Sequence, residues 1–179
     1  MIDLHAHLLP GLDDGPASPA AAVEMARVAH EAGIGTVVCT PHMSDRYPTD
    51  PAAATGAVEL LREALDEADV PLRVLPGGEI ALPHVARLGD EQLRLASIGG
   101  GGRWLLLEMP FQGWPLTLPA LLADLEIRGY GAIIAHPERA EAIQRAPDRM
   151  RDLVGRGRPW GTGCGGCGRP AQGAPSRTR

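Results

Sequence analysis

The chain has 179 residues, a formal net charge of -5 and three cysteines. Its length is typical of one domain with a substantial core, its acidic balance argues against nucleic acid as the main partner, and three cysteines do not make a disulfide framework. Neither a signal-peptide pattern nor an apolar run of about 18–20 residues is found, which predicts a cytoplasmic protein without direct membrane insertion.

Apolar runs alternate with amphipathic helical patterns five times along the chain. The runs typical of buried parallel strands occupy residues 1–7, 35–42, 71–80, 103–110 and 131–139. The helical patterns follow them at residues 18–33, 50–69, 117–129 and 140–154, the last with a break at Pro147, and a shorter helix is expected within residues 82–96. Ser18 and Asp50 each precede a proline and suit the N-cap position. This order predicts an α/β fold in which helices cross over between parallel strands.

The composition changes after residue 154, so we place the folded domain at residues 1–154. Residues 155–179 contain eight Gly, five Arg and three Pro, and no Asp, Glu, Ile, Leu or Val. Such a segment has no side chains for a core, and we expect it to be disordered. Because GC-rich DNA read out of frame yields this composition, we interpret it as a product of a frameshift or of a wrong gene model. Its single CxxC, Cys164 and Cys167, lacks the second ligand pair of a zinc site.

Each predicted strand ends in a side chain that can bind a metal ion. These residues are His5, His7, His42, Glu79, Glu108 and His136. Side chains two residues apart on a strand point the same way, so the two N-terminal histidines can hold one ion. The carboxyl ends of the strands are also where parallel α/β barrels carry their chemistry. Mixed imidazole and carboxylate donors suit Mn, Fe or Zn, and Glu79 is placed to bridge two ions.

The sequence excludes one class of enzyme, the cysteine-dependent tyrosine phosphatases. Such enzymes resemble HCx5R at the reactive loop. Val38 precedes Cys39 where a histidine would be needed, and Asp45 stands where the arginine would be needed. We therefore expect Cys39 to be a buried strand residue.

Five motifs resemble one known family. The stretches "DLHAHLLPGLDDGP", "CTPH", "GGEI", "LLEMP" and "AHPER" are similar to the polymerase and histidinol phosphatase (PHP) superfamily, and more narrowly to its bacterial tyrosine-protein phosphatases of capsular and exopolysaccharide synthesis. The resemblance implies a distorted (β/α)7 barrel with up to three metal ions, often manganese. The family's late motif resembling "SDAH" is missing, because no Asp follows Asp152 and no His follows His136. We therefore expect a barrel truncated to about five β-α units.

The resemblance also implies roles for individual residues. The six strand-end residues would be metal ligands, and Asp14 would lie beside the cluster as a ligand or proton donor. Arg139 would bind the phosphate, and a planar guanidinium suits that task. The alternative for Arg139 is a surface ion pair with Glu138 or Glu141.

The implied activity is metal-dependent hydrolysis of phosphotyrosine on protein. The implied partner is the tail of a membrane-associated tyrosine autokinase. Two alternatives remain: an inactive fragment that at most binds metal or the partner, and a small-molecule phosphoesterase such as a histidinol-phosphate phosphatase.

Overall fold

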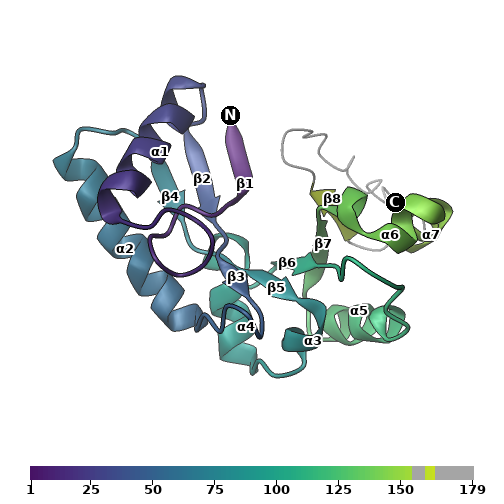
Figure 1. The fold of residues 1–179 in the computed structure, drawn as a ribbon. Helices are drawn as coiled ribbons and strands as arrows, with labels where there is room; N and C mark the ends of the chain where they lie inside the picture. Colours follow the sequence, from purple (N-terminus) through teal and green to yellow (C-terminus); the bar gives the residue numbers. More distant parts are fainter. Residues whose placement is uncertain (155–159, 164–179) are drawn as a thin grey trace, which may run out of the picture.

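A computed structural model describes residues 1–154 and 160–163 of the chain (Figure 1). The strands are β1 (Ile2–Ala6), β2 (Thr36–Cys39), β3 (His42–Met43), β4 (Arg73–Leu75), β5 (Glu79–Ala81), β6 (Trp104–Glu108), β7 (Gly131–Ala135) and β8 (Trp160–Gly163). The α-helices are α1 (Pro19–Glu31), α2 (Pro51–Glu67), α3 (Leu82–Val85), α4 (Asp90–Ala96), α5 (Leu118–Ile127), α6 (Glu141–Arg145) and α7 (Asp148–Val154). Two 3-10 turns, η1 (Ile98–Gly100) and η2 (Pro137–Arg139), complete the described elements.

The strands form two parallel sheets, which confirms the predicted α/β class. One sheet has the order β1-β2-β4 and the other the order β3-β5-β6-β7-β8. Figure 1 shows α1 and α2 together outside the first sheet, and α5 beside β6 and β7 of the second. Each crossover helix returns the chain so that neighbouring strands run the same way, and all their carboxyl ends meet at one side.

Two of the predicted strands are each divided by proline. The run at residues 35–42 is interrupted at Thr40 and Pro41, and the run at residues 71–80 is interrupted at Pro76–Gly78. Proline has no N–H to donate to a sheet ladder, so the pairing stops there. In both cases the first half belongs to the three-stranded sheet and the second half to the five-stranded sheet. The two sheets are therefore joined through continuous chain.

Helix boundaries follow the capping signals. Asp50 Oδ1 accepts hydrogen bonds from the N–H groups of Ala52 and Ala53 at 2.8 and 3.2 Å, and Ser18 Oγ accepts one from Ala21 at 3.3 Å. The predicted break at Pro147 is confirmed, since it separates α6 from α7. The shorter helix predicted within residues 82–96 is present as α4, and a separate helical turn, α3, precedes it.

Strand β8 lies in the segment for which disorder is predicted. Its backbone pairs in parallel with β7 over residues 160–163. Pairing of this kind uses main-chain groups, which every residue type except proline can offer, so a Gly-rich stretch can form it without an apolar pattern. The rest of the expected tail, 155–159 and 164–179, lies outside the described residues, including Cys164 and Cys167.

The core is aliphatic and covers the central strands on both faces. Leu105, Leu106 and Leu107 of β6 are successive residues and all are buried. Successive strand side chains point to opposite faces, so burial of all three requires packing on each side of the sheet. No helix among the described residues is long and apolar enough to cross a membrane.

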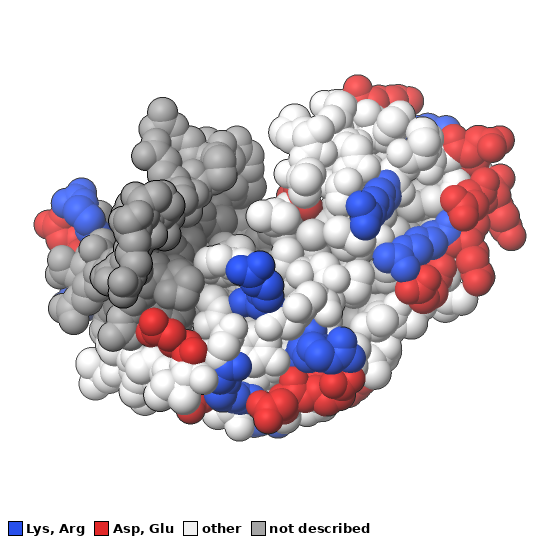
Figure 2. Space-filling model, turned by 180° about the vertical axis from the view of Figure 1, so that it is seen from behind, with Lys and Arg blue, Asp and Glu red and all other residues white. Residues whose placement is uncertain are grey.

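Charged side chains are interspersed over the surface seen in Figure 2, where arginines commonly lie against acidic side chains. Arg94 pairs with Glu91 within α4 at 2.6 Å, and Arg128 after α5 pairs with Asp90 at 2.5 Å. Exposed pairs of this kind contribute little to stability, because water and salt screen their charges.

Gly77 and Gly56 provide a matched pair for testing the bend between β4 and β5. A Cβ at Gly77 would lie 2.8 Å from Val38 Cγ1, whereas a Cβ at Gly56 in α2 would have no atom within 4 Å. We expect Gly77→Ala to lower the free energy of unfolding by about 1–3 kcal/mol through overpacking. Gly56→Ala should raise it by about 0.5–1 kcal/mol, since alanine loses less entropy in a helix. Urea titrations measure both values, and equal effects would contradict the tight approach at Gly77.

Candidate metal centre

The strand register brings the predicted ligands of the five-stranded sheet to one edge. His42 in β3 pairs directly with Glu79 in β5. Glu108 ends β6 and pairs with Ala135, which ends β7, and His136 follows at once. His42 and Glu79 open β3 and β5, just after the breaks that divide the predicted strands, whereas Glu108 ends β6 and His136 follows β7. The four donors thus come from neighbouring strands of one sheet.

The two N-terminal histidines reach this edge from the three-stranded sheet. The ring of His5 lies 4.7 Å from the ring of His136, and the ring of His7 lies 4.5 Å from that of His42, measured between centroids. Nε2 of His5 and Nε2 of His7 are 3.4 Å apart. The site therefore lies where the two sheets meet.

Glu79 lies at the centre of the cluster. Its side chain is 2% exposed. Oε2 of Glu79 is 3.1 Å from Nε2 of His5, 3.1 Å from Nε2 of His7 and 3.3 Å from Nδ1 of His42. None of these contacts has hydrogen-bond geometry, so this buried oxygen has no hydrogen-bond partner among the described residues. Three imidazole nitrogens thus converge on one carboxylate oxygen without donating a hydrogen bond to it.

This arrangement fits a divalent metal ion. Two ligand atoms that are each about 2.1 Å from one ion lie roughly 3.0–3.4 Å apart in common coordination geometries. The contacts of Glu79 Oε2 fall in that range. Two donor groups form around it, His5–Glu79–His136 and His7–His42–Glu79, each with ligand atoms within 4.8 Å of one another. Glu79 is common to both groups, which is the placement expected for a bridging carboxylate.

Glu108 and Asp14 lie at the border of these groups. Oε2 of Glu108 is 3.6 Å from Nδ1 of His42. Oδ1 of Asp14 is 3.7 Å from both Nδ1 of His7 and Nε2 of His42, and its side chain is 60% exposed. Asp14 is thus the most accessible carboxylate of the cluster and faces solvent on one side.

Sequence reasoning selected Asp14 and missed its neighbour Asp13. The Asp13 side chain is fully buried. Its Oδ2 accepts a hydrogen bond from Nδ1 of His7 at 2.6 Å and another from the backbone N–H of His42 at 2.9 Å, while Oδ1 accepts one from Gly15 N at 2.9 Å. A carboxylate on Nδ1 fixes the ring and directs Nε2 toward the metal position. The two adjacent aspartates in the sequence were the available signal for a carboxylate at the site. Sequence alone does not show which of two identical neighbours is buried.

The charges of the cluster stabilise one another. Burial alone would raise the pKa of Glu79, but the contacts with His5 and His7 and the charge of His42 lower it to about 2. Burial alone would lower the pKa of His7, but the hydrogen bond to Asp13 and the contact with Glu79 raise it to about 10. In the metal-free protein, a proton on the His7 ring therefore balances the buried carboxylates beside it.

His136 has an unusual backbone conformation. Its φ of 41° and ψ of 53° lie in the left-handed region. This region is unfavourable for residues with a Cβ, although histidine enters it more often than most. Nδ1 of His136 is 3.1 Å from Oε1 of Glu138, two residues later. The turn into η2 thereby points the ring back toward His5.

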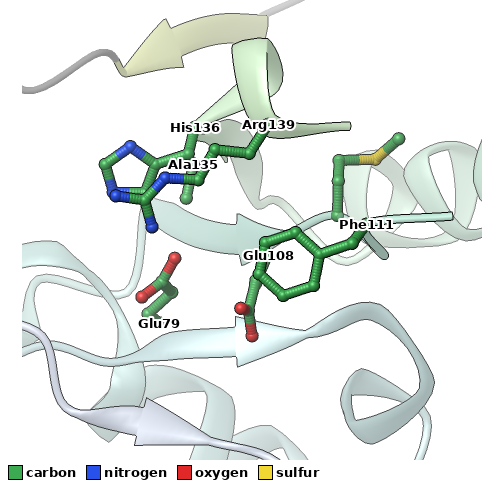
Figure 3. A pocket seen from close by; sticks show the side chains of 7 residues that line it. Glu79, Glu108, Phe111, Ala135, His136 and Arg139 are labelled. Carbon is green, nitrogen blue, oxygen red and sulfur yellow. The ribbon is translucent and has the colours of Figure 1, made fainter. Parts of the chain in front are cut away.

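A shallow pocket opens beside the cluster. Its volume is about 210 Å³, part of it open to solvent, and it is lined by Glu79, Glu108, Met109, Phe111, Ala135, His136 and Arg139 (Figure 3). The two glutamates point into it from β5 and β6, and Arg139 reaches it from η2. Metal donors and a guanidinium thus face the same small space.

Arg139 is exposed, and neither ion pair considered from the sequence is formed. Glu138 contacts His136, and Glu141 pairs with Arg145 at 2.6 Å. The described residues give Arg139 no ion pair of 4.0 Å or less, in contrast to Arg94 and Arg128. A guanidinium that is free at a pocket mouth is available for an anionic ligand.

Cys39 takes no part in the site. It is fully buried in β2, as predicted, and burial raises the pKa of its thiol to about 12. The thiolate that a cysteine phosphatase needs is therefore not accessible here.

Comparison with known proteins agrees with this geometry. The family model described as capsular polysaccharide synthesis, CpsB/CapC, matches residues 1–160. The chain belongs to the CpsB/CapC family. This confirms the resemblance drawn from the sequence motifs.

Several relatives of the chain carry the name tyrosine-protein phosphatase or putative tyrosine-protein phosphatase. The chain is 39% identical over 158 residues to the tyrosine-protein phosphatase YwqE of Bacillus subtilis, and 31% identical to CapC of Staphylococcus aureus. Each alignment covers 88% of this chain and 62% of the relative. The chain therefore spans less than two thirds of the length of these relatives.

A solved structure shares the fold. It comes from the crystal structures of YwqE from Bacillus subtilis and CpsB from Streptococcus pneumoniae, described as unique metal-dependent tyrosine phosphatases. The TM-score is 0.75 at 38% identity, over 86% of this chain and 62% of the other. The PHP-type fold predicted for this chain is confirmed by this match.

Asp13 and Asp14 allow a direct test of which aspartate supports the metal. We expect Asp13→Asn to weaken Mn²⁺ binding by about 10–100-fold, because an amide holds the ring of His7 less firmly than a carboxylate. Asp14→Asn should change it less, since Asp14 is exposed and farther from both rings. Titration with Mn²⁺, followed by the shift in Tm, measures both. A larger loss for Asp14→Asn would contradict the role of Asp13.

The raised pKa of His7 predicts that metal binding depends on pH. Its ring must lose a proton before Nε2 can bind an ion, so protons compete with metal at any pH below about 10. We expect Mn²⁺ affinity to rise steadily from about pH 6 to about pH 8. Calorimetric titrations in buffers of different ionisation enthalpy should show proton release. A flat affinity profile would show that His7 is already neutral.

Proposed function

We propose that the chain hydrolyses phosphotyrosine on protein with divalent metal ions. The observation that carries the proposal is the pair of donor groups that share Glu79, placed in one pocket with the free guanidinium of Arg139. The names of the relatives, tyrosine-protein phosphatase YwqE above all, support this choice of substrate. The proposal extends to the metal, for which manganese is our first choice and iron or zinc the alternatives.

The six predicted ligands divide between the two donor groups and their border. His5 and His136 hold one position, His7 and His42 hold the other, and Glu79 serves both. Glu108 completes the second position from the side. Bound divalent metals supply Lewis acidity, which polarises phosphoryl oxygens and activates water near neutral pH. The group His7–Asp13–Asp14 also has the spacing of a metal site, but both ring nitrogens of His7 are then in use, one by Asp13 and one at the second position.

Two residues act directly on the substrate in this proposal. Arg139 binds the nonbridging phosphate oxygens with paired N–H groups and stabilises the charge that spreads over them during transfer. Asp14 lies at the exposed edge of the cluster, and we assign it as a ligand or as the proton donor to the departing phenolate oxygen. Both roles require only the positions that these side chains already have.

The proposed substrate is the phosphorylated tail of a membrane-associated tyrosine autokinase. We propose that the chain binds this tail in the cytoplasm. The capsular polysaccharide family of the chain supports a partner from that process. A shallow pocket suits a flexible tail, because a single phosphorylated side chain can enter it without the rest of the protein.

Two alternative functions predict different results in activity measurements. A fragment without activity would take up metal and leave phosphotyrosine peptide intact, which is a real alternative because the chain spans 62% of the length of YwqE. A small-molecule phosphoesterase would prefer histidinol phosphate. Rates on both substrates with Mn²⁺ added, and after removal of metal with EDTA, separate all three functions.

Arg139→Ala tests the phosphate-binding role. We expect kcat on a phosphotyrosine peptide to fall by about 10²–10³-fold, the loss seen when other positioned donors are removed. Metal content should stay the same, because arginine is not a metal ligand at neutral pH. Arg139→Lys should recover little of the rate, since an ammonium cannot form the paired contact.

His5→Ala is the control for this experiment. It removes a donor that contacts Glu79 at 3.1 Å, so metal and activity should be lost together. Steady-state rates and elemental analysis of each dialysed variant give the two readouts. Near-normal kcat for Arg139→Ala would show that the guanidinium is a surface charge only.

A further inference from the structure

The loop between β6 and α5 places one aromatic ring in solvent at the candidate site. Phe111 is 61% exposed, although large apolar side chains are normally buried. Its backbone is held in place, because its carbonyl oxygen accepts a hydrogen bond from the N–H of Glu141 at 3.0 Å. Met109, two residues earlier, is buried. The ring is therefore presented by an anchored backbone and is left uncovered.

Phe111 and the metal donors line the same pocket. Glu79 lies at its buried end, where it is 1% exposed, and the exposed side chains of Phe111 and Arg139 lie at its mouth (Figure 3). The pocket is small, and part of its space of about 210 Å³ is open solvent. It suits one phosphorylated group and the first atoms attached to it.

We propose that Phe111 makes the site selective for aryl over alkyl phosphate esters, an inference that rests on the proposed function. A phosphate bound between the metal donors and Arg139 leaves its ester oxygen directed toward the mouth. The group carried by that oxygen then meets Phe111. In phosphotyrosine this group is an aromatic ring, whereas in phosphoserine or histidinol phosphate it is a methylene.

Ring contact gives the selectivity its physical basis. Two aromatic rings in offset or edge-to-face contact attract each other beyond the effect of buried area, and both lose contact with water. A methylene offers a small fraction of that surface. Phe111 therefore acts as a specificity-determining residue, because its ring has no donor or acceptor group for the transferred oxygens.

The test compares ligands that differ only in the organic group. Phenylphosphonate and methylphosphonate are not hydrolysed, so the binding of each to the Mn²⁺-loaded chain can be measured by calorimetry. We expect the wild-type chain to prefer phenylphosphonate. Phe111→Ala should weaken phenylphosphonate binding by about 3- to 10-fold and leave methylphosphonate binding unchanged. Phe111→Tyr should keep the preference.

Leu116→Ala is the matched control. Leu116 is 88% exposed on the same loop but does not line the pocket, so its removal should change neither affinity. In parallel, kcat/KM for a phosphotyrosine peptide and for the phosphoserine peptide of the same sequence should show the same selective loss in Phe111→Ala.

The outcomes separate this inference from the proposed function. Hydrolysis of phosphate esters with no aryl preference in the wild-type chain, or an equal loss on both phosphonates in Phe111→Ala, would overturn the role of Phe111 and leave the phosphatase proposal standing. Failure of the wild-type chain to bind either phosphonate or to hydrolyse either peptide would overturn both.

Discussion

The arrangement of the site depends on one buried carboxylate oxygen. Oε2 of Glu79 is removed from water, and three imidazole nitrogens lie within 3.1–3.3 Å of it without forming hydrogen bonds. An ionised carboxylate in such a place is costly by several kcal/mol unless positive charge is close. The protonated ring of His7 provides such charge in the metal-free chain, and a divalent ion would provide more of it. Metal binding and folding are thus coupled through this oxygen.

The backbone around Glu79 explains how the oxygen reaches its position. Pro76 ends the pairing of β4, and Gly77 passes so close to Val38 that a Cβ there would lie 2.8 Å from it. The chain then enters the second sheet beside His42. Because both divided strands cross between sheets at the same level, donors from β1, β3 and β5 converge. An uninterrupted strand would keep its residues in one sheet.

Much of this could be predicted from sequence because the signals are local. The caps at Ser18 and Asp50, and the donors at strand ends, depend on residue type and spacing alone. The division at Pro41 and Pro76 was also visible in principle, but apolar runs on both sides favoured single strands. The separate roles of Asp13 and Asp14 depend on burial, which is a property of the folded chain. The pairing of β8 depends on main-chain groups and leaves no side-chain pattern.

The left-handed backbone of His136 sets stability and chemistry against each other. Glycine is the residue best suited to a φ of 41°, and a side chain held there costs of order 1–3 kcal/mol. Selection for heat resistance alone would thus favour glycine at this position and would remove an imidazole donor. Laboratory evolution under thermal selection, without a demand for metal, should drift toward such stable and empty forms. The strain at position 136 is in this sense the cost in stability of placing an imidazole beside Glu79.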